Sequence, residues 1–152
     1  MTTQKKTAAA LAIAVAIAAP FEGLRNWAYR DPVGIPTICF GSTKGVRMGD
    51  YKTTAECKAL LTHEMREFVE TVDRCAPGLP PNALAAFSSA AFNVGPALTC
   101  GDTTAARLLR QGHWREACDQ LPRWNKARVA GQLVELPGLT KRRAAERELC
   151  LS

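Results

Sequence analysis

The sequence predicts an α+β fold that is mostly helical and carries a small β subdomain near its N-terminus. Three observations predict it. An uncharged apolar run occupies residues 7–21, a segment rich in glycine, proline and aromatic residues follows at 22–45, and apolar residues recur at helical spacing from residue 54 onward. Aromatic and β-branched residues broken by glycine and proline are typical of short strands and turns, whereas a repeat of about 3.6 residues is typical of helices.

The apolar run at residues 7–21 follows Lys5 and Lys6 and contains Ala16-Ile17-Ala18, which are elements of a cleavable export signal. As a helix it would span about 22 Å, against about 30 Å for a bilayer core, and about half of it is alanine, so a bilayer would hold it weakly. A cleaved signal, a weak uncleaved anchor and a buried core helix all remain open. We favour the weak anchor, with residues 1–20 as the segment that forms the first helix.

Helical patterns fill most of the remaining chain. Thr54 opens a capped segment whose apolar residues keep helical spacing to about Cys75, which predicts a long helix. Three prolines break it, and Asn82 can cap a second helix over 83–93, which is apolar nearly all round and is therefore expected at the centre of the domain. Shorter helices are expected at 103–110, 114–121 and 140–149.

Composition fits one globular domain and narrows its partners. The chain has 152 residues, of which 47% are apolar and 22% charged, and a formal net charge of +6. That charge suits a polyanionic partner, but no zinc-finger, Walker or RNP-type motif occurs and the basic residues are spread along the chain. We expect a monomer with no cofactor, no metal and no nucleic-acid partner.

Six cysteines lie at wide intervals with no CxxC pair, which argues against a metal site and favours disulfides made in an oxidising compartment. They are Cys39, Cys57, Cys75, Cys100, Cys118 and Cys150. The spacing alone does not select their connectivity.

Two carboxylates lie nine residues apart, Glu22 at the end of the apolar run and Asp31 at a turn before a proline. Glycoside hydrolysis needs a protonated carboxyl to donate to the leaving oxygen and an ionised carboxylate to direct water. Apolar neighbours favour protonation of Glu22, and a polar turn keeps Asp31 charged. Thr37 could offer a hydroxyl to the same water. From spacing alone the simpler interpretation is favoured: a capping or paired acid, a turn former and a strand residue.

The residues around this constellation carry a family resemblance. The stretches EGLR at 22–25, YRD at 29–31 and GIPTICFG at 34–41 closely resemble the signature of phage T4-type lysozymes, glycoside hydrolase family 24, including the order Glu, eight residues, Asp, five residues, Thr. The resemblance continues to the end of the chain through residues 91–95, 114–118, 123–124 and 138–143.

The resemblance implies an endolysin that cuts the β-1,4 bond between N-acetylmuramic acid and N-acetylglucosamine in peptidoglycan, with a catalytic domain over residues 21–152 whose β lobe and helical lobe flank the substrate cleft. It implies that Glu22 is the general acid, that Asp31 orients or activates water and that Thr37 supports that water. Phe92 and Asn93 match positions that line the cleft, although Phe92 also fits plain core packing. Inversion, typical of the family, needs carboxyls about 6.5–9.5 Å apart.

Some members of the family are signal-anchor-release endolysins, which are exported with an uncleaved, weakly hydrophobic helix that later leaves the membrane, and residues 7–21 resemble that helix. The implied locations are the host inner membrane, then the periplasm. We hypothesise that insertion keeps Glu22 away from Asp31 and Thr37 until release.

The resemblance also bears on the cysteines and on Ser42. Relatives share four cysteines, which suggests Cys39 with Cys57 and Cys118 with Cys150, leaving Cys75 and Cys100, on either side of the central helix, to join each other. Thiol exchange as an activation switch stays open. Ser42 stands where many relatives carry a histidine, so a structural histidine pair is not expected.

Two rival functions are kept. A lytic transglycosylase would cut the same bond with one acid and leave a 1,6-anhydro product, but Asp31 and Thr37 argue against it. A cationic membrane-disrupting protein would use the apolar run and the +6 charge without any glycosidase chemistry.

Overall fold

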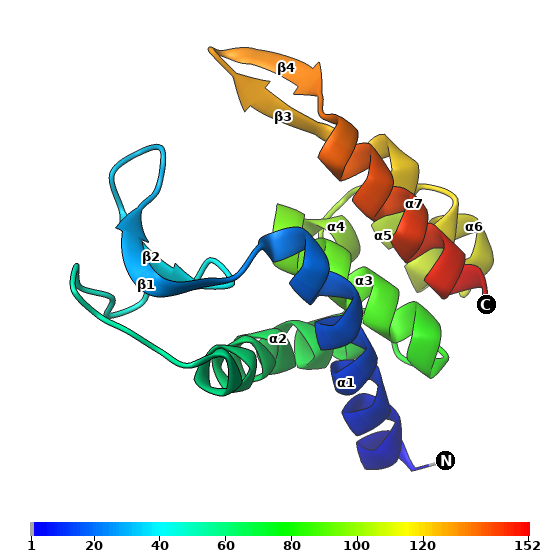
Figure 1. Ribbon diagram of the computed structural model, residues 1–152. Helices are drawn as coiled ribbons and strands as arrows, with labels where there is room; N and C mark the ends of the chain where they lie inside the picture. Colours follow the sequence, from blue (N-terminus) through cyan, green and yellow to red (C-terminus); the bar gives the residue numbers. More distant parts are fainter. Residues whose placement is uncertain (1) are drawn as a thin grey trace.

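The computed structural model describes residues 2–152 and confirms the α+β class (Figure 1). The helices are α1 (Thr3–Glu22), α2 (Thr54–Cys75), α3 (Pro81–Val94), α4 (Ala97–Cys100), α5 (Thr104–Arg110), α6 (Trp114–Cys118), the 3-10 helix η1 (Leu121–Arg123) and α7 (Pro137–Leu151). Two separate antiparallel hairpins pair β1 (Arg25–Arg30) with β2 (Pro36–Cys39) and β3 (Lys126–Val129) with β4 (Gln132–Glu135).

Helix α1 contains the apolar run and packs into the helical core, against both α2 and α3. Three alanines four residues apart, Ala10, Ala14 and Ala18, are fully buried on one of its faces. Because alanine projects only a methyl group, this face lets α1 approach its neighbours closely. Among residues 2–152, no helix combines the length and the apolarity needed to cross a membrane.

The tight packing of α1 predicts a position-dependent effect of added volume. Ala14→Leu is expected to lower the free energy of unfolding by about 1–3 kcal/mol, because three extra carbons must fit into a filled core. Ala16→Leu adds the same side chain on the exposed face of the same helix and serves as the control. Urea denaturation measures both, and equal stabilities would contradict the packing described for α1.

The β lobe is a hairpin closed by a turn at Asp31–Gly34, where Gly34 N donates to Asp31 O over 2.9 Å. The segment that leads to α2 returns along the free edge of β1, since Ala28 N donates to Asp50 O and Lys52 N to Asn26 O, each over 2.9 Å. A disulfide from the end of β2 to α2 then fastens the lobe to the helices.

Helix α2 begins and ends where the sequence predicts. Its cap is Thr53, whose hydroxyl accepts from Glu56 N while the Glu56 carboxylate accepts from Thr53 N, a complete capping box. The central helix α3 is buried from Ala83 to Ala91, as expected. The expected cap at Asn82 is wrong: α3 already begins at Pro81, and the Asn82 amide instead donates to Ser152 Oγ at the C-terminus.

Two elements of the C-terminal region depart from the sequence prediction, and α7 begins three residues before the expected helix at 140–149. The expected helix at 114–121 ends at Cys118, because a proline at position 122 would clash with the carbonyl four residues earlier if the helix continued. The hairpin of β3 and β4 was not predicted. Its two-residue turn has Ala130 at φ 51° and Gly131 at φ 81°, and its strands are mostly exposed, so they lack the buried alternation that marks a strand in a sequence.

The disulfides join Cys39 to Cys57, Cys75 to Cys100 and Cys118 to Cys150, which confirms the pairing that the resemblance suggested. All six cysteines are thereby paired, and none belongs to α1. Each bond closes a loop of 18 to 32 residues, long enough to restrict the unfolded chain substantially.

Candidate active site

Glu22 is the last residue of α1 and lies where the first and last helices meet. Its Oε1 accepts a 2.6 Å hydrogen bond from Nη1 of Arg142 on α7, and its side chain is 18% exposed. A side chain added at Gly41, just after β2, would place its Cβ 4.0 Å from Glu22 Oε2. The carboxylate thus lies between the β lobe and α7. Besides the apolar neighbours that the sequence indicates, a guanidinium contacts the carboxylate directly, which the sequence did not predict.

Arg142 is held on three sides. Besides Glu22, its Nε donates to Glu146 Oε1 over 3.0 Å and its Nη2 to the Ser89 carbonyl over 3.1 Å. The side chain is only 3% exposed. Sequence reasoning missed this contact because the two partners lie 120 residues apart, and the charge-rich α7 sequence gives no sign of which arginine is buried.

The charged cluster extends behind Arg142 to a second, fully buried pair, Arg143 and Glu146. Arg143 Nε lies 2.7 Å from Glu146 Oε2. Burial raises the pKa of the Glu146 carboxyl, and attraction to the two arginines opposes that shift. Burial likewise lowers the pKa of Arg143, against the attraction of Glu146. Charged side chains therefore continue from Glu22 through Arg142 into the buried core of the helical lobe.

Asp31 and Thr37 are brought together by the backbone of Ile35. Oδ1 of Asp31 accepts from Val33 N over 3.0 Å and from Ile35 N over 2.8 Å. The hydroxyl of Thr37, 4% exposed, donates to Ile35 O over 2.9 Å. Within residues 2–152 no protein donor reaches Oδ2 of Asp31. One carboxylate oxygen is thus fixed by the turn, and the other is left to bind something else.

The two expected substrate contacts, Phe92 and Asn93, lie near the C-terminal end of α3. Phe92 is half-buried, packs edge-on against Phe68 with ring centroids 5.3 Å apart, and joins the main core. Asn93 is exposed and accepts from Arg143 Nη2 over 2.9 Å. Phe92 also packs against the smaller hydrophobic cluster of the β lobe, and Asn93 borders the charged cluster.

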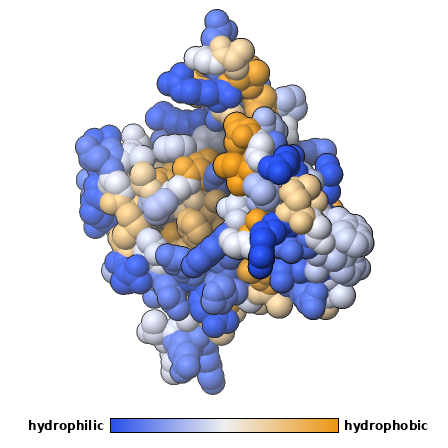
Figure 2. All heavy atoms as spheres, turned by 90° about the vertical axis from the view of Figure 1, so that its left-hand side faces the viewer, coloured by the Kyte–Doolittle hydropathy of each residue, from blue (hydrophilic) through white to orange (hydrophobic). Residues whose placement is uncertain are grey.

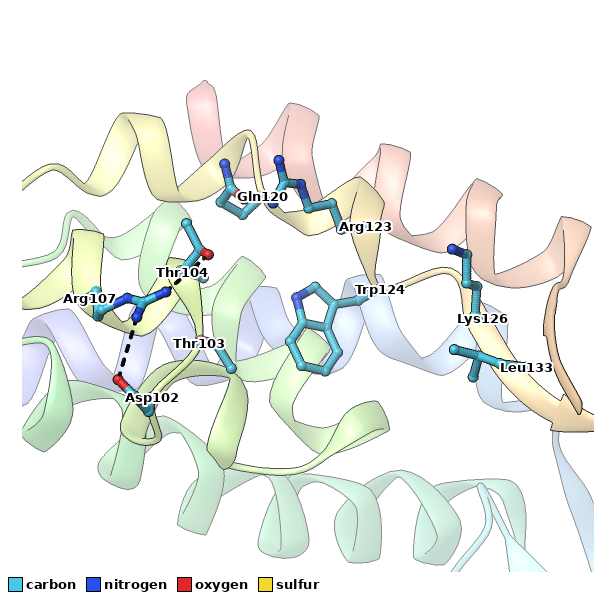
Figure 3. Close-up of a pocket in the computed structure, with 10 residues that line it drawn as sticks. Asp102, Thr103, Thr104, Arg107, Gln120, Arg123, Trp124, Lys126 and Leu133 are labelled. Atoms are coloured by element: carbon cyan, nitrogen blue, oxygen red, sulfur yellow. Dashed lines mark hydrogen bonds and ion pairs between the residues drawn. The ribbon is translucent and has the colours of Figure 1, made fainter. Parts of the chain in front are cut away.

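A pocket of about 550 Å³ opens on the helical lobe between the start of α5 and the β3–β4 hairpin. Figure 3 shows Trp124, Lys126 and Leu133 reaching it from the side of the hairpin, and Thr103 from the opposite side. None of the sequence-predicted site residues lines it.

The face of the molecule that carries the β lobe has both hydrophobic and hydrophilic areas. Figure 2 shows hydrophobic residues toward the middle of this face, with hydrophilic residues around them. Within residues 2–152, no three histidine, cysteine, aspartate or glutamate side chains gather as metal ligands would.

Comparison with known proteins places these residues in a family context. A family model described as Phage lysozyme matches residues 19–146. The SAR-endolysin of Pseudomonas phage phiKMV is 40% identical over 144 residues, which cover 94% of this chain and 89% of that protein. The muramidase domain of SpmX from Asticaccaulis excentricus is 32% identical with a TM-score of 0.83, covering 91% of this chain and 95% of that one.

The P1 phage endolysin Lyz offers two solved forms for comparison. Its active form is 30% identical with a TM-score of 0.73, covering 91% of this chain and 83% of that one. Its secreted inactive form is 26% identical with a TM-score of 0.58, covering 94% and 93%. The fold described above is therefore more similar to the active form than to the inactive one.

Proposed function

Because the chain belongs to the phage lysozyme family and is an endolysin, a muramidase that lyses peptidoglycan, we propose that Glu22, Asp31 and Thr37 carry out the hydrolysis. The bond is the β-1,4 link between N-acetylmuramic acid and N-acetylglucosamine. The observation that carries the proposal is the position of Glu22 between the two lobes. Arg142 of α7 contacts its carboxylate on one side, and Gly41, just after β2 of the β lobe, lies on the other.

Glu22 gives its proton to the oxygen of the glycosidic bond as that bond breaks. This is the role of the general acid in glycoside hydrolysis. Arg142 contacts the same carboxyl over 2.6 Å, so it fixes the direction in which the acid points and stabilises the carboxylate that remains after the proton has left.

Asp31 and Thr37 bind the attacking water. Oδ2 of Asp31 takes one proton from the water, while Oδ1 stays fixed by two backbone N–H groups. The Thr37 hydroxyl already donates its proton to Ile35 O, so it can only accept the second hydrogen of the water. With both hydrogens engaged, an oxygen lone pair of the water is free to attack the anomeric carbon.

Attack by a water held opposite the leaving group predicts inversion. We expect the first product from purified peptidoglycan or a chitooligosaccharide to be the α-anomer, which proton NMR detects before mutarotation. A β-anomer formed first would contradict the assigned water and indicate a covalent intermediate. A 1,6-anhydro end would indicate the transglycosylase alternative.

We further propose that the chain is exported and that α1 lies transiently in the inner membrane through residues 7–21. The name of the phiKMV relative, SAR-endolysin, supports this proposal. While α1 is inserted, Glu22 is separated from Arg142. Release docks α1 on α2 and α3 and completes the site.

Leucines on the exposed face of α1 test this step without disturbing the folded core. In Ala12→Leu/Ala16→Leu, we expect a larger membrane-bound fraction and delayed lysis, because the segment becomes more apolar. The matched variant Ala12→Ser/Ala16→Ser is expected to shift the protein toward the periplasm. Cell fractionation measures both. Equal distributions, or a fully active chain that begins near Ala19, would contradict an uncleaved anchor.

A further inference from the structure

Glu146 lies in the core of the helical lobe, is fully buried, and forms no hydrogen bond or ion pair with Glu22. Its carboxylate nevertheless accepts three hydrogen bonds and makes one further ion-pair contact. Oε1 accepts from Ser89 Oγ over 2.8 Å, from Arg142 Nε over 3.0 Å and from Arg143 Nη2 over 3.1 Å, and Oε2 lies 2.7 Å from Arg143 Nε. Such a set of donors suits an ionised carboxylate.

Arg142 joins this buried carboxylate to the acid of the site. Its Nε contacts Glu146 and its Nη1 contacts Glu22, so one rigid guanidinium spans both carboxylates. The Ser89 carbonyl holds the remaining Nη2. Glu146 and Ser89 thus hold two nitrogens of the guanidinium while the third, Nη1, donates to Glu22.

The charges of the cluster balance in pairs. Two guanidinium groups, Arg142 and Arg143, face two carboxylates, Glu22 from α1 and Glu146 from α7 itself. The groups that α3 contributes, Ser89 and Asn93, are uncharged. Removing the charge of Glu146 would leave both arginines with Glu22 as their one anionic partner in this cluster.

We propose that Glu146 is a positioning residue for the hydrolysis: it holds Arg142 from behind and thereby sets the orientation of Glu22 and the balance of charge around it. The inference rests on the proposed role of Glu22 as the acid. It assigns Glu146 an effect on catalysis although Glu146 touches neither substrate nor acid.

The test is the pH profile of kcat/KM on purified peptidoglycan for Glu146→Gln. We expect the basic limb, which reports loss of the proton from the acid, to move to lower pH by about one unit, because two unbalanced guanidinium groups favour ionised Glu22. Glu148→Gln removes the same charge from an exposed position on α7 and is expected to leave the limb in place. A limb that coincides in the two variants overturns the proposal.

Glu146→Asp provides a second test that does not depend on whether the glutamine variant folds. It keeps the charge but is too short to keep the contact with Arg142 Nε, so we expect kcat to fall about tenfold with KM and the basic limb unchanged. A wild-type kcat would overturn the positioning role. Glu22→Gln distinguishes failure of this inference from failure of the proposed function. If that variant is active, Glu22 is not the acid and the proposed function itself fails.

Discussion

Replacing Glu22 with glutamine is expected to lower kcat on purified peptidoglycan by about a thousandfold, the scale of a lost general acid. Glutamine is nearly the same size, and its amide oxygen can still accept from Arg142 Nη1, so α1 and α7 stay joined. What is lost is the proton for the leaving oxygen. Turbidity loss of cell walls and release of reducing sugar measure the effect.

Glu148→Gln is the matched control for this substitution, since it removes an exposed carboxylate from the helix that carries Arg142. Its rate is expected to equal that of the wild type. If exported Glu22→Gln lysed cells as fast as the wild type, the lysis would come from membrane disruption and not from a glycosidase.

Asp31→Asn is expected to lower kcat by at least about a hundredfold with a small effect on stability. The asparagine carbonyl can still accept from Val33 N and Ile35 N, so the turn that Asp31 organises is preserved. The second oxygen becomes an NH₂ group, which donates and so cannot take a proton from the attacking water. Product analysis should show loss of the new muramic-acid reducing end.

The neighbouring loop provides the control. Asp50 also uses its carboxylate to accept a backbone N–H, that of Arg47 over 2.8 Å, but it lies outside the proposed site. Asp50→Asn is expected to keep wild-type activity. A full rate in Asp31→Asn would show that no base is needed at this position, and the water would then have to be oriented by other groups.

The long helix α2 could be predicted because its information is local: a capping box at Thr53 and apolar residues one helical turn apart. The β3–β4 hairpin could not, since its short strands are exposed and its turn residues Ala130 and Gly131 are a weak turn sequence. The end of α6 could not be predicted exactly either. The proline at position 122 shows that the helix must stop before it, but not at which residue.

The candidate site also contains residues that the sequence could predict and residues that it could not. Glu22, Asp31 and Thr37 lie within 16 residues of one another, so a family pattern can be recognised in a single stretch. Arg142 and Glu146 come from the other end of the chain, inside a helix with many charges. Their burial follows from how α7 packs against α3, which the periodicity of α7 alone does not reveal.

The contact between Glu22 and Arg142 also orders events during synthesis. A ribosome finishes the stretch with Glu22, Asp31 and Thr37 early, but the guanidinium that holds the acid emerges only when nearly the whole chain has been made. Nascent or truncated chains that end before α7 therefore contain the three proposed catalytic residues but lack Arg142, the partner that contacts Glu22.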